Sequence, residues 1–167
     1  ASDVYKRQEL ERLRAEVEYL EEMLPKYPLY VTFEENNTQM LLPGDVVTYI
    51  TSIITIRGLS KIPQRPVDVL VQVALVFTKS RPDLGFEIDW GRRYYVSNIT
   101  STVLDEIYVP WAAFPVKVEH SQPGDWVKLE IYVAVKVLGT GQTPAGRQVT
   151  VTLAVEAATA YILIRVM

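Results

Sequence analysis

The 167-residue sequence contains no cysteine and only one histidine. Without cysteine the chain has no disulfide scaffold, no thiolate zinc site and no cysteine nucleophile. One histidine leaves a transition-metal site short of nitrogen ligands. His120 is followed directly by Ser121, and neighbours in sequence do not give the geometry of a nucleophile and its base. We therefore expect no enzymatic activity, no catalytic residue, no metal and no cofactor.

The sequence is also poor in basic residues and in long apolar runs. Its 17 Lys and Arg are spread thinly against 20 Asp and Glu, which argues against a nucleic-acid partner. No segment approaches the roughly 18 consecutive apolar residues of a membrane-spanning helix, and no secretory signal is present. Since the chain begins at Ala1, we expect either a processed product or a fragment that lacks its upstream part, and any membrane link would lie in that part. Residues 1–8 resemble a translated sequencing adapter and are expected to be non-native.

Alternation of apolar and polar residues with period two dominates the middle of the chain. Residues 67–78 and 126–138 place a large aliphatic or aromatic side chain at almost every second position, which is typical of a strand with one buried face. Two Pro-Gly-Asp turns, beginning at Pro43 and Pro123, open two of the long strands. In such a turn glycine takes the positive φ, and aspartate can accept hydrogen bonds from backbone amides.

The remaining strands are shorter or less regular. We expect them at residues 29–33, 46–57, 86–90, 94–96, 107–109 with 112–119 as one bent strand or two, 147–157 and 160–167, with a polar turn at 34–38 and a hairpin loop at 139–146. Eight or nine strands without intervening helices predict a mainly β fold, an antiparallel β-sandwich of immunoglobulin-like or jelly-roll type. We assign residues 26–167 to this one domain.

Residues 9–24 follow a helical period instead, and residues 1–25 are predicted to form an N-terminal amphipathic helix that ends at Pro25. The apolar seam of this helix consists of Leu10, Leu13, Val17, Leu20 and Leu24. It covers barely two heptads, fewer than a coiled coil usually needs. Three arrangements stay open: packing on the chain's own sandwich or on a neighbouring subunit, a short coiled-coil stalk, or a mobile arm.

Aromatic residues gather in the second half of the sandwich. The candidates for a ligand or partner surface are Trp90, Tyr94, Tyr95, Trp111 and Trp126. Aromatic faces stack on sugar rings or anchor a protein partner, and they equally fill the ends of a sandwich. Asn36 and Asn98 each begin an Asn-x-Thr pattern, the acceptor for N-glycosylation in an exported protein.

The Pro-Gly-Asp turn that opens a long strand of Thr, Val and Ile, at residues 42–56 and 122–137, resembles the immunoglobulin-like sandwiches of bacterial and archaeal cell-surface proteins. The order of helix, short connector and sandwich is similar to type IV pilin-like and archaellum accessory subunits. The resemblance implies a structural or interaction subunit, extracellular or at the cell surface of an archaeal or hyperthermophilic organism. Such a subunit assembles as a homo-oligomer or filament, or with other surface proteins, through its helix seam and strand edges. The alternative expectation is a carbohydrate-binding module that uses the exposed aromatics.

Overall fold

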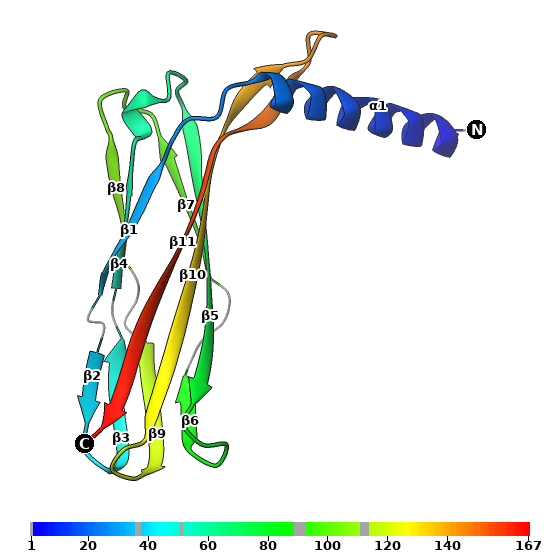
Figure 1. The fold of residues 1–167 in the computed structure, drawn as a ribbon. Helices are drawn as coiled ribbons and strands as arrows, with labels where there is room; N and C mark the ends of the chain where they lie inside the picture. Colours follow the sequence, from blue (N-terminus) through cyan, green and yellow to red (C-terminus); the bar gives the residue numbers. More distant parts are fainter. Residues whose placement is uncertain (1, 36–37, 51, 89–92, 111–113) are drawn as a thin grey trace.

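The computed structural model is a tall β-sandwich from whose upper end one helix projects (Figure 1). The structure describes residues 2–35, 38–50, 52–88, 93–110 and 114–167. The elements in chain order are α1 (Ser2–Met23), β1 (Tyr30–Glu35), β2 (Thr38–Leu41), β3 (Gly44–Ile50), β4 (Ser52–Arg57), the 3-10 helix η1 (Leu59–Lys61), β5 (Val67–Lys79), β6 (Gly85–Ile88), β7 (Arg93–Ile99), β8 (Glu106–Pro110), β9 (Phe114–Ser121), β10 (Trp126–Gln142) and β11 (Gln148–Val166).

Three sheets form the two layers of the sandwich. One layer is a five-stranded sheet with the order β2-β11-β10-β5-β7. The other layer is divided into an upper sheet, β1-β4-β8, and a lower sheet, β3-β9-β6 (Figure 1). Among the described residues all strand pairs are antiparallel except β2 with β11, which run parallel. The predicted mainly β sandwich with one N-terminal helix is confirmed, and this parallel pair is the exception to its antiparallel character.

The two central strands of the five-stranded sheet supply much of the core. In β10 every second side chain is buried, from Val127 to Val137, and in β5 the same holds from Val67 to Val73. Their burial against the opposite layer contributes roughly 25 cal/mol for each Å² of apolar surface removed from water. The alternate side chains of both strands face away from the core. This sheet therefore has one face in the core and one face open to solvent.

The number of strands corrects the sequence prediction, because the described residues contain eleven strands rather than eight or nine. Residues 46–57, expected as one strand, form β3 in the lower sheet and β4 in the upper sheet. For the segment expected as one bent strand or two, the structure shows two, β8 paired with β4 and β9 paired with β3. Period two describes which side chains are buried, and it carries no information on where a strand changes its hydrogen-bonding partner.

The hairpin loop predicted at residues 139–146 is present but shorter than predicted. β10 continues to Gln142, β11 starts at Gln148, and only the short turn between Thr143 and Arg147 joins them. The 147–157 and 160–167 segments belong to one strand, β11. The β10–β11 register shifts where Val137 faces Ala154 and Leu138 faces Thr152, which is a β-bulge at Leu153. Residues 138–152, beyond the bulge, are called the hairpin arm below.

Both Pro-Gly-Asp turns have the predicted geometry. Gly44 has φ 109° and Gly124 has φ 91°, in the region that glycine adopts without strain. Asp45 Oδ1 accepts the backbone N–H of His120 at 2.8 Å. Asp125 Oδ2 accepts the backbone N–H of Gln122 at 2.8 Å. The two turns therefore organise the lower end of the sandwich.

Candidate interaction surfaces

Helix α1 leaves the top of the sandwich at a steep angle, and its C-terminal end packs against the sandwich (Figure 1). The contacts lie at the bulge that opens the hairpin arm. Glu21 Oε1 accepts the Thr152 N–H at 2.9 Å, and Lys26 Nζ donates to the Thr152 carbonyl at 2.5 Å. The backbone N–H of Tyr27 donates to the Leu153 carbonyl at 2.9 Å. The helix and its connector thus satisfy three backbone groups of β11 at the bulge.

The predicted seam of the helix is only partly covered. Leu13, Val17, Leu20 and Leu24 are half-buried, and Leu20 and Leu24 pack against the core. Arg147, at the tip of the hairpin arm, lies 3.4 Å from Glu9. Leu10 is 64% exposed. The seam therefore packs in part on the chain's own hairpin arm and continues beyond it as an open apolar position.

Close approach of the helix to the hairpin arm depends on Gly141. A Cβ at this position would come 2.8 Å from Leu20 Cδ2 and 3.2 Å from Val151 Cγ1. We expect Gly141→Val to displace the helix at a cost of about 1–2 kcal/mol, and hydrogen exchange of the Thr152 amide to accelerate roughly tenfold. The control is Thr150→Val, at an exposed position of the same arm. Unchanged exchange in Gly141→Val would show that the helix does not pack as described.

The outer face of the five-stranded sheet is the second candidate surface, and we call it the open sheet face. It consists of the side chains of β5, β7, β10 and β11 that point away from the core. Its centre is apolar and accessible, with Tyr94, Val96 and Val155 each more than half exposed. Two shallow hollows of about 260 and 240 Å³ share Gln72 and Ala134 as lining residues. Contiguous exposed apolar surface of this kind marks interaction sites.

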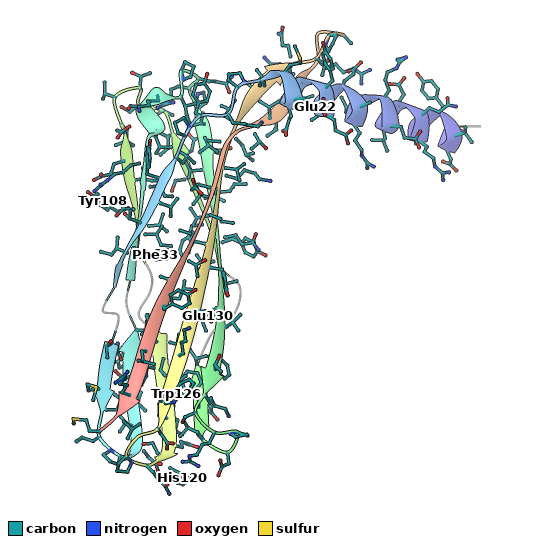
Figure 2. All side chains as sticks on the ribbon, viewed as in Figure 1. Glu22, Phe33, Tyr108, His120, Trp126 and Glu130 are labelled. Carbon is teal, nitrogen blue, oxygen red and sulfur yellow. The ribbon has the colours of Figure 1, made fainter. Side chains whose placement is uncertain are left out.

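The structure does not bring the predicted aromatic residues together. Tyr94 lies on the open sheet face, whereas its neighbour Tyr95 points to the other side and packs against the core. Trp126 lies near the lower end of the sandwich (Figure 2). Eight residues of β10, roughly 26 Å at 3.3 Å per residue, separate it from Ala134, which lies in the same row as Tyr94. Trp90 and Trp111 fall outside the described residues.

Sequence reasoning missed the aliphatic part of the open sheet face. A signal was present, because Leu70 and Val76 of β5 occupy positions whose neighbours two residues away are polar or small, and Val96 of β7 follows Tyr94 at the same spacing. These apolar residues fall at the alternate strand positions whose side chains face solvent. Taken one strand at a time they are unremarkable, and only the register across four strands gathers them into one surface.

Of the two glycosylation candidates, only Asn98 belongs to the described residues. Asn98 ends the exposed side of β7, on the open sheet face, and its Nδ2 donates to Asp68 Oδ1 at 2.9 Å. Asn36 lies outside the described residues. Within the described ranges, no three His, Asp or Glu side chains gather as a metal site, and no helix is long and apolar enough to cross a membrane.

A buried carboxylate fixes the lower end of the sandwich. Asp125 Oδ1 accepts Arg81 Nε, and Asp125 Oδ2 accepts a second guanidinium nitrogen, both at 3.0 Å. Ser80 Oγ and the Gln122 N–H also donate to this carboxylate. The Arg81 guanidinium, followed by the Gln122 amide, lowers the pKa of Asp125 to about 2. Its partners belong to the loop after β5 and to the turn before β10, so we assign Asp125 a stabilising role.

No model of a known protein family matches this sequence, and comparison with curated proteins gives no match. The solved structures that resemble the fold include the following two. One is AggA, the major subunit of aggregative adherence fimbriae type I from Escherichia coli, with 14% identity and a TM-score of 0.38 over 86% of this chain and 99% of that chain. The other is a cohesin module of a family 33 glycoside hydrolase from Clostridium perfringens, with 13% identity and a TM-score of 0.34 over 85% and 100%. Likeness at this level does not assign the chain to a family.

Proposed function

We propose that this protein is a non-enzymatic structural or interaction subunit of an extracellular or cell-surface assembly. Its neighbours in that assembly contact the seam of α1. The observation that carries the proposal is the projecting helix, whose seam extends past the hairpin arm and leaves Leu10 open. Folding buries only part of this apolar stripe, so a partner is the natural cover for the part that stays exposed at Leu10.

The charge of the helix indicates what kind of partner fits. Residues 2–23 contain seven acidic and four basic residues, so the helix accounts for the whole net charge of −3 and the remainder of the chain is neutral. Two such helices side by side repel one another, whereas a neutral sandwich surface does not. We therefore expect the seam to meet a sandwich surface of a neighbouring subunit. Filament formation and an archaeal source stay predictions.

Molar mass by light scattering tests this function. We expect the intact chain to form oligomers, and both a chain beginning at Lys26 and the Leu10→Gln variant to lose the helix-dependent part of that mass. The matched control is Tyr19→Gln, because Tyr19 is 55% exposed and lies half a helical turn away from the seam. Equal mass of the intact chain and Leu10→Gln at every concentration would contradict the proposal.

The carbohydrate-binding alternative has less support from the geometry. Stacking on a saccharide requires aromatic rings that lie close together on one surface. Tyr95 points away from Tyr94, and Trp126 lies eight residues along β10 from the row of Tyr94. Quenching of tryptophan fluorescence by a saccharide would support the carbohydrate-binding alternative.

A further inference from the structure

We propose that the open sheet face binds the same face of a second copy of this chain. The contact is a two-fold symmetric interface, separate from the helix seam and independent of the function proposed for it. Tyr132 of each copy lies over Ala134 of the other at its centre.

The strand register places the outward side chains in rows across the sheet. Each row takes one residue from β5, one from β10 and one from β11. The four central rows are Leu70, Lys136 and Val155; Gln72, Ala134 and Ala157; Ala74, Tyr132 and Thr159; Val76, Glu130 and Tyr161. On β7, Val96 extends the first row and Tyr94 extends the second row.

These rows are complementary to themselves. A two-fold axis that crosses the strands midway between the rows of Ala134 and Tyr132 reverses the order of the rows and lays each strand over its own copy. The Tyr132 ring of one copy then stands over Ala134 of the other, beside the two hollows of about 260 and 240 Å³. The same operation sets Lys136 over Glu130. The large side chains thus meet small ones or hollows, and opposite charges face each other.

The outer rows of this arrangement are apolar as well. Leu70 of one copy lies over Val76 of the other, and Val155 lies over Tyr161. Val76, Val155 and Tyr161 are each at least half exposed in the single chain, so the contact removes apolar surface that folding leaves in water. Two right-twisted sheets that pack face to face align within about 30°, which keeps the rows in contact near the axis.

The size of the face agrees with a weak but specific dimer. Four strands at about 4.8 Å span about 19 Å, and the rows from Lys136 to Glu130 with their side chains span about 27 Å, which gives roughly 500 Å² per copy. About 1,000 Å² in total is the lower bound for a specific interface. The charges fix the orientation more than the affinity. Glu130 already accepts the Tyr132 hydroxyl at 2.5 Å, with Lys128 Nζ at 3.8 Å, so its carboxylate is held in place to meet Lys136.

The first test is the dissociation constant of the full-length chain carrying Leu10→Gln, measured by sedimentation. This background removes the open seam position and leaves the sheet untouched. We expect a concentration-dependent dimer that Ala134→Arg weakens at least tenfold, because arginine fills the space of the opposing Tyr132 ring. Val47→Arg, at an exposed position of β3 in the other layer, serves as the control and leaves the dimer unchanged. A monomer at every concentration before Ala134 is changed would overturn the proposal.

A charge exchange tests the interface without a bulky substitution. Lys136→Glu and Glu130→Lys each set like charges against one another across the axis, so each variant alone is expected to dimerise at least tenfold more weakly. An equimolar mixture of the two variants places opposite charges at both symmetry-related contacts, so the mixture is expected to recover the dimer. Failure of the mixture to recover, or no loss in either variant, would overturn the two-fold arrangement. Loss of mass in Leu10→Gln with no effect of either sheet variant would overturn this inference and leave the helix-based function standing.

Discussion

Replacing Asp125 by alanine is expected to lower the free energy of unfolding by about 3 kcal/mol, since it removes one partner of a buried, hydrogen-bonded ion pair. The Asp125 side chain is only 9% exposed, and its two oxygens hold Arg81, Ser80 and the Gln122 amide. The loop after β5 and the turn before β10 are therefore joined through this one carboxylate. Urea unfolding followed by circular dichroism measures the loss.

Asp83 offers a matched control, because it pairs with the same guanidinium at 3.0 Å but is 80% exposed. Exposed pairs contribute little, so Asp83→Ala is expected to leave the unfolding midpoint almost unchanged. Equal losses in Asp83→Ala and Asp125→Ala would show that burial of the Asp125 carboxylate is not the source of the effect.

The same carboxylate predicts a dependence of stability on pH. The folded state holds the pKa of Asp125 at about 2, below the 3.8 of the free side chain. Since the folded pKa is lowered, the stabilisation is complete above about pH 4 and is lost as the pH falls toward 2. At 1.36 kcal/mol per unit this is about 2 kcal/mol. Stability measured between pH 5 and 2 should fall less steeply in Asp125→Asn than in the unchanged chain, and parallel curves would contradict the prediction.

Replacing Gly139 by alanine is expected to cost about 3 kcal/mol. The side chain of Gln64 forms two hydrogen bonds with the backbone of Thr140, the residue after Gly139 in β10. Gln64 Oε1 accepts the Thr140 N–H and Gln64 Nε2 donates to the Thr140 carbonyl, both at 2.6 Å, and we call this pair the clamp. A Cβ on Gly139 would overlap Gln64 Oε1 and come within 2.6 Å of Leu153 Cδ1. The clamp would open, at about 1 kcal/mol per hydrogen bond, and the overlap with Leu153 would add about 1 kcal/mol or more.

A double-mutant cycle checks this cause. Gln64→Ala removes the same two hydrogen bonds and one of the two overlaps, so the two substitutions together should cost about 2 kcal/mol less than the sum of the single costs. Strict additivity, measured by chemical denaturation, would show that Gly139 does not act through Gln64.

Gly139 and Gly141 also explain why the hairpin loop was predicted to begin too early in the sequence. The sequence Gly-Thr-Gly has the composition of a loop, and glycine weakens an isolated strand. In the fold both residues belong to β10, because Gln64 and Leu20 approach the backbone too closely for any side chain. These partners lie far from the glycines in sequence, so local strand propensity does not predict the contacts.

The predicted cluster of aromatic residues does not form among the described residues, for a different reason. Their positions in sequence suggested one cluster, but alternation sends Tyr94 and Tyr95 to opposite faces and the length of β10 carries Trp126 to the far end. Residues close in sequence are therefore separated in the sandwich, and the surface that forms instead combines β5, β7, β10 and β11. Its members come from residues 70–161, and only the pairing register brings them together.

The sequence by itself determined the elements that depend on local pattern. Period two specified the buried faces of β5 and β10, the seam spacing with Pro25 specified α1, and the two Pro-Gly-Asp turns specified where β3 and β10 start. Tertiary structure alone decided the division of the layer opposite the five-stranded sheet, the bulge at Leu153, the direction of the helix and the open sheet face. The physical reason is that burial of a side chain follows from its own neighbours along the chain, whereas hydrogen-bonding partners and shared surfaces depend on segments that lie far apart in the sequence.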